Sequence, residues 1–256
     1  MRITGVGHAV IAAMMIVLGL LCVIERDQAP VWGIPDGSPP LLPYTCAIVS
    51  LATGIGLLVP RVAALAARVL LVYLVLWLLL VRAHDLVVAP GSFGAWDGLA
   101  ELAVIIAAAW VVYVSLATEW DRKHVRFASG EGGVRIAHVL YGLPQVAFGM
   151  AHFLYLDRTI AFVPRYMPAP TFWAYFTGVT FIAAGVAIVT GVFARLAATL
   201  VAIQIGLFTI LAWIPILRAS PDAALWNEFG MSVALTIAAG VVAASYRGRA
   251  WFAAKS

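Results

Sequence analysis

Hydrophobic residues occur in long runs along the whole chain, and short polar or proline-rich segments separate these runs. A helix that crosses the hydrocarbon core of a bilayer needs about 20 predominantly apolar residues. Eight runs are of this length, at residues 5–24, 41–59, 62–81, 98–116, 135–156, 171–190, 194–217 and 225–245. Helices satisfy their own backbone hydrogen bonds, as lipid requires. The pattern therefore predicts an all-α polytopic membrane protein with eight transmembrane helices.

The composition agrees with this prediction. Of the 256 residues, 64% are hydrophobic and 11% are charged, whereas soluble domains have roughly 45–50% apolar residues and about a quarter charged. Such a chain has too few polar residues to cover a water-facing surface, which excludes a soluble globular enzyme, a disordered chain and a disulfide scaffold. The net charge of +4 is explained by membrane topology, so no nucleic-acid partner is predicted.

The distribution of basic residues predicts an orientation. An even number of spans places both termini on one side, and that side carries eleven of the sixteen Lys and Arg residues. Positive charge marks the cytoplasmic face, so we expect both termini in the cytoplasm and the protein in a bacterial inner membrane. The eleven residues are Arg2, Arg61, Arg68, Arg122, Lys123, Arg126, Arg135, Arg195, Arg247, Arg249 and Lys255.

The chain contains an internal duplication, because residues 5–116 match residues 135–246 at a constant offset of 130. Four helices per copy is an even number, so the two copies run parallel in the membrane, as in some transporters. We expect a first four-helix repeat at 1–117, a charged cytoplasmic linker at 118–134 and a second repeat at 135–256. The matches pair His8 with His138, Gly19 with Gly149, Asp27 with Asp157, Pro40 with Pro170 and Trp96 with Trp226.

Four segments of the second copy carry a resemblance to a known family. They read FGMAHF at 148–153, FVPRYMPAP at 162–170, FWAYFTG at 172–178 and GVFARLA at 191–197. In these segments the chain resembles the DoxX-like integral membrane proteins, most clearly over residues 135–246 and more faintly in the first copy. The resemblance implies a four-helix membrane bundle related to the small DoxD subunit of thiosulfate:quinone oxidoreductase. Many members of the family have an acid shortly after the Thr-Gly pair, where this chain has Thr180 and Phe181.

Polar residues form one stripe on the fifth predicted helix. His138, Tyr141, Gln145 and His152 have spacings that place them on one helical face, and lipid offers them no hydrogen bonds. The stripe should therefore face the bundle interior or a wet cavity, with Gln204 of the seventh helix opposite. We predict these five residues as the ligand-binding set, in which a His and a Gln hydrogen-bond the two carbonyl oxygens of a quinone. In the alternative interpretation the two glutamines only join helices.

The histidines also permit a haem hypothesis, which we consider weaker. His8 with His138, and His84 with His152, would form two pairs at opposite faces, as a two-haem bundle requires. No haem-specific motif accompanies them, so haem is not expected and the cofactor stays unknown, with quinone the first candidate. No Cys/His spacing typical of zinc occurs, so no metal site is predicted.

Acid and arginine residues recur at the outer ends of the helices. Arg82 closes the third run while Asp97 and Glu101 open the fourth, and antiparallel neighbours would bring them together as an ion pair. Arg218 and Glu228 repeat this arrangement in the second copy. Glu101 is the deepest acid, which makes it a candidate proton carrier or a contact for a polar head group.

Cys22 ends the first predicted helix and Cys46 begins the second, near the face where disulfides persist. Two buried free thiols, a disulfide and a redox-active pair are all compatible with these positions.

These observations support three hypotheses for function. The leading one is a quinone- or lipid-linked redox component that works with a redox partner subunit. The second is a non-catalytic membrane module that binds lipid or another small hydrophobic ligand, or scaffolds a partner. The third is a transporter-like pore between the repeats. The sequence does not decide whether the protein is an enzyme.

Overall fold

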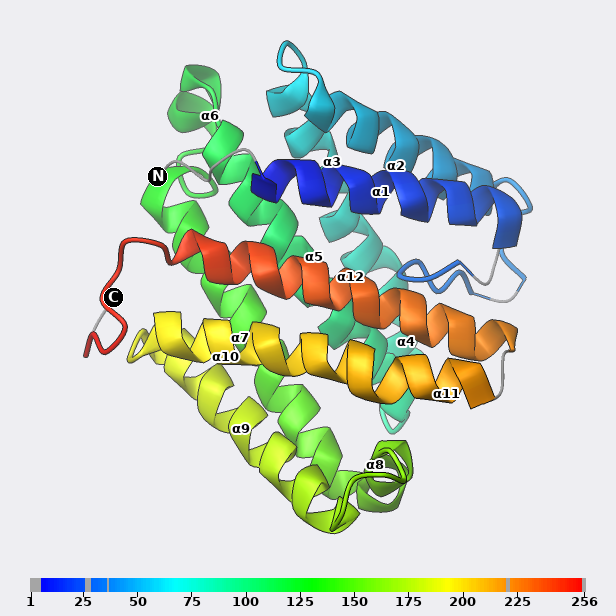
Figure 1. Cartoon of the computed structure of the whole chain (residues 1–256). Coiled ribbons are helices and arrows are strands. Elements are labelled where there is room, and N and C mark those ends of the chain that lie inside the picture. The colour runs from blue at the N-terminus through cyan, green and yellow to red at the C-terminus, as the bar shows by residue number, and fades with distance from the viewer. Residues whose placement is uncertain (1–5, 26–28, 36, 220–221, 255–256) are drawn as a thin grey trace.

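The computed structural model describes residues 6–25, 29–35, 37–219 and 222–254. Within these ranges the regular secondary structure is helical, and no strand occurs. The predicted all-α class is therefore confirmed (Figure 1). The predicted linker at 118–134 ends earlier than expected, because a long helix already begins at Gly130.

The helices divide between the two halves of the chain. The first half contains α1 (Val6–Glu25), α2 (Leu42–Leu58), α3 (Ala63–Trp77), the π-helix η2 (Leu78–Arg82), α4 (Ala83–Val88), α5 (Phe93–Leu116) and the short α6 (Glu119–His124). The second half contains α7 (Gly130–Leu154), α8 (Leu156–Phe162), α9 (Pro170–Thr190), α10 (Ala194–Phe208), the π-helix η3 (Thr209–Trp213), α11 (Ile214–Ala219) and α12 (Ala223–Ser245).

Length and hydropathy identify fewer membrane spans than the sequence predicts. Six helical segments of the described chain are long and apolar enough to cross a bilayer, and α7 with α8 makes a seventh if this pair, bent by 98°, counts as one span. The predicted span at 41–59 corresponds to α2, which is apolar but only 17 residues long. The six are Val6–Glu25, Ala63–Val88, Phe93–Leu116, Pro170–Thr190, Ala194–Ala219 and Ala224–Ser245. The protein is thus a polytopic helical membrane protein.

The long helices run back and forth between two ends of the molecule. The first turn of α1 and the last turn of α12 lie at the same end (Figure 1). We call the opposite end, which contains residues 89–92 and 163–169, the far end. Which end faces the cytoplasm stays a prediction, and Arg2 and Lys255 of the eleven basic residues lie outside the described residues.

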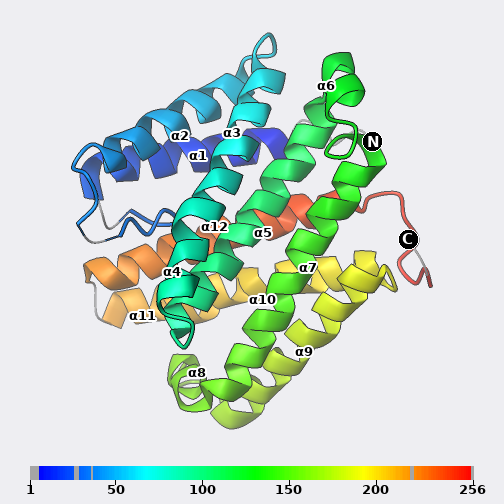
Figure 2. The same ribbon diagram turned by 180° about the vertical axis from the view of Figure 1, so that it is seen from behind.

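The two halves contain their long helices in the same order. In the first half α1 packs on α2, α2 on α3 and α3 on α5, and in the second half α7 packs on α9, α9 on α10 and α10 on α12. Each half also has a five-residue π-helix after its third long helix, η2 and η3. The halves meet where α5 packs along α7 and against α12 (Figure 2). The predicted duplication would account for this common order.

Glycines bring α7 and α9 into close contact. A Cβ atom at Gly185 would lie 2.7 Å from the carbonyl oxygen of Gly142, and one at Gly149 would lie 2.6 Å from that of Gly178. Small residues at such positions let helix backbones approach closely, which is a main source of helix association in lipid. The pair α7–α9 therefore forms a closely packed wall of the second half.

A buried carboxylate fixes the linker between the halves. Asp121 of α6 is fully buried and accepts hydrogen bonds from Arg68 Nε at 2.9 Å, Tyr113 Oη at 3.0 Å and Thr118 Oγ1 at 2.6 Å. Burial alone would raise the pKa of Asp121, but the donors, Arg68 first, outweigh it and hold this pKa well below its usual range. The linker is thereby attached to α3 and α5.

Candidate functional site

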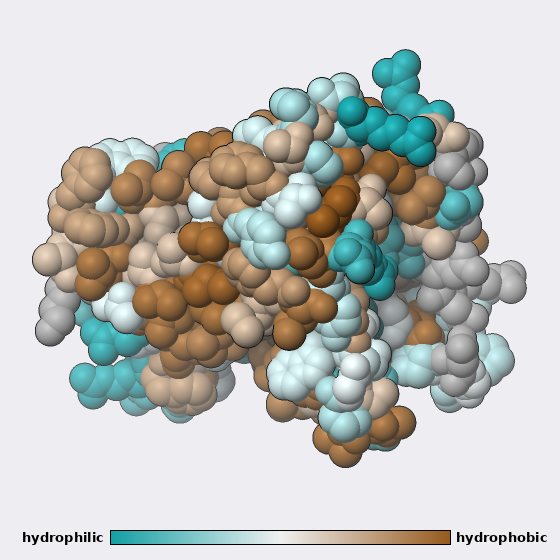
Figure 3. Space-filling view, turned by 90° about the horizontal axis from the view of Figure 1, so that it is seen from below, coloured by the Kyte–Doolittle hydropathy of each residue, from teal (hydrophilic) through white to brown (hydrophobic). Residues whose placement is uncertain are grey.

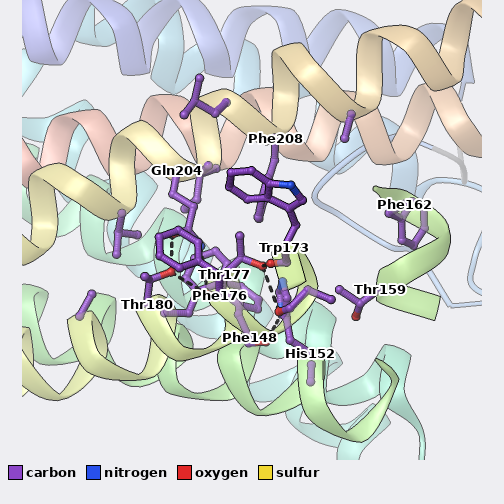
Figure 4. A pocket seen from close by; sticks show the side chains of 18 of the residues that line it. Phe148, His152, Thr159, Phe162, Trp173, Phe176, Thr177, Thr180, Gln204 and Phe208 are labelled. Atoms are coloured by element: carbon purple, nitrogen blue, oxygen red, sulfur yellow. Dashed lines mark hydrogen bonds between the residues drawn. The ribbon is translucent and has the colours of Figure 1, made fainter. Parts of the chain in front are cut away.

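A cavity of about 820 Å³ lies mainly in the second half, lined by residues of α7, α8, α9, α10, η3 and α12 and by three residues of α5 (Figure 4). Its lining is largely aromatic and aliphatic, and includes Phe148, Phe162, Trp173, Phe176, Phe181, Phe208 and Trp213. Ligand pockets in proteins have volumes of roughly 300–1,000 Å³ and mainly apolar linings with a few polar groups. The cavity therefore has the size and character of a site for a hydrophobic small molecule.

The divergence of α9 and α10 shapes this cavity. The two helices are joined by a tight turn at Gly191, whose φ of 79° suits glycine, and they separate toward the far end (Figure 1). At the far end Tyr166 Oη donates a hydrogen bond to the Leu211 carbonyl at 2.8 Å, and Phe162 packs against Trp213 with ring centroids 5.3 Å apart. Aromatic residues thus border the cavity at the far end.

Several apolar lining residues of the cavity are exposed. Leu200 and Ile203 of α10 and Phe176 of α9 line the cavity and are 54%, 53% and 48% exposed. Brown apolar side chains cover much of the face seen in Figure 3, with smaller hydrophilic areas between them. Exposed apolar side chains of a membrane protein are expected to face lipid, and in this protein some of them border the cavity.

His152 of the predicted set lies in the cavity. Its Nδ1 atom is 2.7 Å from the Phe148 carbonyl oxygen, and a carbonyl only accepts hydrogen bonds. Nδ1 therefore carries a proton, and in the neutral form of the ring Nε2 is an acceptor. The ring lies beside Phe181 and Phe208, at centroid distances of 5.5 and 6.4 Å. This histidine is half-buried and offers the cavity one acceptor in an aromatic setting.

Gln204 of the predicted set also lines the cavity, where it joins α10 to α9. Its Oε1 atom accepts a hydrogen bond from Thr180 Oγ1 at 2.7 Å, and its Nε2 atom donates to the Thr177 carbonyl at 3.3 Å (Figure 4). A second N–H of the amide remains for a ligand. The expectation that a glutamine joins helices holds for this residue.

The other three predicted residues do not line the cavity. His138, Tyr141 and Gln145 are buried in the protein interior. His138 Nε2 lies 2.8 Å from Ser245 Oγ, and its ring stacks on Tyr246. Near the start of α7, this face contacts the last residues of α12. Near the end of α7, the same face borders the cavity.

Gln145 belongs to the predicted stripe that Gln204 should face, but its Nε2 atom donates to the Tyr141 carbonyl of its own helix at 3.0 Å. Among the described residues no hydrogen bond joins the two glutamines. The Gln145 Oε1 and Tyr141 Oη atoms have no hydrogen-bond partner in this part of the chain. The predicted stripe is thus divided between the core and the cavity.

A second chamber of about 230 Å³ adjoins the cavity at the far end and is lined by charged residues. The two spaces share Phe93, Asp97, Glu101, Arg158 and Glu228 in their linings. The lining of the chamber also includes Arg82, Gly98 and Asn227, which do not line the cavity. An apolar cavity that adjoins a charged chamber has the polarity of an amphipathic molecule.

The predicted partner of Arg82 is not the one found. Its NH1 atom lies 3.9 Å from Asp85 Oδ2, and its NH2 atom donates to the Val31 carbonyl at 3.2 Å. In the described ranges no ion pair within 4 Å links Arg82 to Asp97 or Glu101. Val31 and Asp85 are the partners of the Arg82 guanidinium. Arg82 therefore lines the same chamber as Asp97 and Glu101 without forming an ion pair with them.

Sequence reasoning did not place Arg158 in the site. Arg158 belongs to the short α8, whose orientation depends on the 98° bend after α7. Its guanidinium lies over the Phe93 ring, 5.1 Å from the centroid. The sequence offers one indication, because Arg158 is not among the eleven basic residues assigned to the cytoplasmic side.

The cysteines take no part in the cavity. Cys22 and Cys46 are free and fully buried, and Cys46 Sγ accepts a hydrogen bond from Tyr73 Oη at 3.2 Å. In the described chain no group of three or more His, Cys, Asp or Glu residues is arranged to hold a metal ion. Comparison with known protein families, with curated proteins and with solved structures found no match.

Proposed function

We propose that this membrane protein binds a membrane lipid as a non-catalytic module, with the lipid chains in the cavity between α7, α9 and α10. The observation that carries the proposal is an apolar cavity of about 820 Å³ that shares five lining residues with a charged chamber at the far end. A lipid has the same division into an apolar and a polar part. Lateral access supports it, because exposed Leu200 and Phe176 border the cavity.

A specific observation favours a quinone as the second candidate. The neutral His152 ring offers an acceptor at Nε2 and Gln204 offers an amide N–H, both in the aromatic cavity. A bound hydroquinone would donate one O–H to His152 Nε2. Its opposite oxygen would accept a hydrogen bond from the Gln204 amide. The resemblance to DoxX-like proteins agrees with this candidate. A redox component with a partner subunit is its extension.

The wider setting belongs to the same proposal. The chain would form eight spans as two parallel four-helix repeats in a bacterial inner membrane. The basic residues near the start of α1 and the end of α12 would place that end in the cytoplasm. The charged chamber at the far end would then lie at the outer membrane interface, at the depth of lipid head groups.

The bound molecule can be identified directly. The full chain would be purified in a mild detergent, and the molecules retained after exhaustive washing would be extracted and analysed by mass spectrometry. We expect phospholipid. Recovery of a quinone in its place would favour the second candidate, and recovery of neither would contradict both.

A further inference from the structure

The charged chamber suggests which lipid is bound. We propose that it selects a phospholipid whose head group carries both a phosphate and a primary ammonium group, as in phosphatidylethanolamine. This inference rests on the proposed function. The two opposite charges of such a head group would meet the two kinds of charged side chain that line the chamber, arginines and carboxylates.

The cationic side of the chamber consists of Arg82 and Arg158. The Arg82 guanidinium lies so close to Gly33 and Gly98 that a Cβ atom at either position would overlap it, so these glycines leave the space that it occupies. Its Nε atom is buried without a hydrogen-bond partner among the described residues. Arg158 is exposed at the chamber and rests on the Phe93 ring. Guanidinium groups present planar sets of donors that suit phosphate oxygens.

The anionic side consists of Asp97, Glu101 and Glu228. In the described ranges none of them has a hydrogen bond or a basic nitrogen within 4 Å. Asp97 and Glu101 are half-buried, and Glu228 is exposed. Neighbouring carboxylates repel each other, and a ligand cation would offset that repulsion. An ammonium group brings three N–H donors for them.

Other ligands of the chamber fit less well. The carboxylates are not arranged as a metal site in the described chain, which disfavours a divalent cation. Phosphatidylglycerol would bring a negative charge and no positive one to three acids. Phosphatidylcholine has a cation, but its quaternary nitrogen has no N–H to donate. The primary amine is the group that satisfies the carboxylates by charge and by hydrogen bonding.

The shared lining places the head group and the chains correctly. Phe93, Asp97 and Glu101 border both spaces, so a head group in the chamber would lie directly at the mouth of the apolar cavity. The acyl chains would then run between α7, α9 and α10 and leave through the exposed apolar border. The chamber determines head-group preference, and the cavity determines that a lipid binds.

The preference is measured by native mass spectrometry of the full chain in mild detergent. The delipidated protein is titrated with phosphatidylethanolamine, phosphatidylcholine and phosphatidylglycerol of identical chains. We expect phosphatidylethanolamine to bind at least about ten-fold more tightly than the other two, since charge-assisted hydrogen bonds are the stronger ones. Asp97→Asn should reduce that ratio. Arg158→Gln should weaken all three lipids, because all three carry the phosphate.

Two variants serve as matched controls. Asp157→Asn and Arg165→Gln make the same chemical changes at exposed residues that line neither space, and both should keep the preference of the wild type. If Asp97→Asn fails to fold, the exposed Glu228→Gln takes its place.

The possible failures are distinguishable. Equal binding of the three lipids by the wild-type protein would overturn the head-group inference and leave the proposed lipid binding intact. A preference that survives Asp97→Asn and Glu228→Gln unchanged would overturn the assignment to these carboxylates. Binding of no phospholipid would overturn both the inference and the proposed function.

Discussion

The close approach of α7 and α9 can be tested by adding a single methyl group. In Gly185→Ala the new Cβ would lie 2.7 Å from the Gly142 carbonyl oxygen, 2.7 Å from a Val146 methyl and 3.0 Å from the Val146 backbone nitrogen. Two of these three atoms belong to the backbone. The contact can therefore be relieved only if the two helices move apart, which would disturb the wall of the cavity.

Gly240→Ala is the matched control. Gly240 lies in α12, is exposed, and a Cβ there would meet no atom within 4 Å. Replacing glycine by alanine inside a helix stabilises by roughly 0.5–1 kcal/mol at either position. Only Gly185→Ala adds an overpacking cost of about 1–3 kcal/mol. Because the helix term is common to both variants, the difference between them isolates the cost of the close contact.

The assay is reversible unfolding in mixed detergent micelles, followed by far-ultraviolet circular dichroism. We expect Gly185→Ala to be less stable than Gly240→Ala by about 1–3 kcal/mol. Equal free energies of unfolding for the two variants would refute the glycine-mediated contact between α7 and α9.

Two further predictions concern buried polar groups. Tyr113→Phe should lower the free energy of unfolding by about 1 kcal/mol, because it removes a hydrogen bond to Asp121. Tyr141→Phe should not lower it, because the buried Tyr141 hydroxyl has no hydrogen-bond partner in the described chain. The reverse order in the same unfolding assay would contradict both assignments. Because the pKa of Asp121 is lowered by folding, its contribution to stability should be complete well above the unfolded-state pKa of about 4 and should decline as the pH falls through that value. Asp121→Asn should flatten that decline, and an unchanged pH profile would show that the carboxylate does not stabilise the linker.

The helical membrane fold could be predicted from the sequence because hydrophobic runs record which segments lie in lipid. The helix ends were less predictable. The run at 135–156 marks the apolar part of α7, but the helix begins earlier, at Gly130, and ends before Tyr155, where the chain bends. Hydropathy does not record where hydrogen-bond register changes, so the π-helices η2 and η3 were also unforeseen.

The candidate site was predicted in part. Helical spacing indicates that His138 and His152 share one helix, and both lie in α7. Of the two, His152 alone lines the cavity, because the packing of α7 against its neighbours differs along its length. Tertiary packing also decides that Arg82 pairs with Asp85 and that Arg158 joins the chamber from α8. Spacing along one helix gives direction, whereas the site depends on how several helices diverge.

The central claim is that the cavity of the second half holds the lipid. Its most direct test is the amount of phospholipid retained per protein after washing in mild detergent, compared between two variants. Ala187→Trp places an indole in the cavity, whereas Ala52→Trp adds the same group at an exposed position of α2 outside it. We predict that Ala187→Trp loses most of the bound lipid and that Ala52→Trp retains the wild-type amount. Equal retention by both variants would contradict the account.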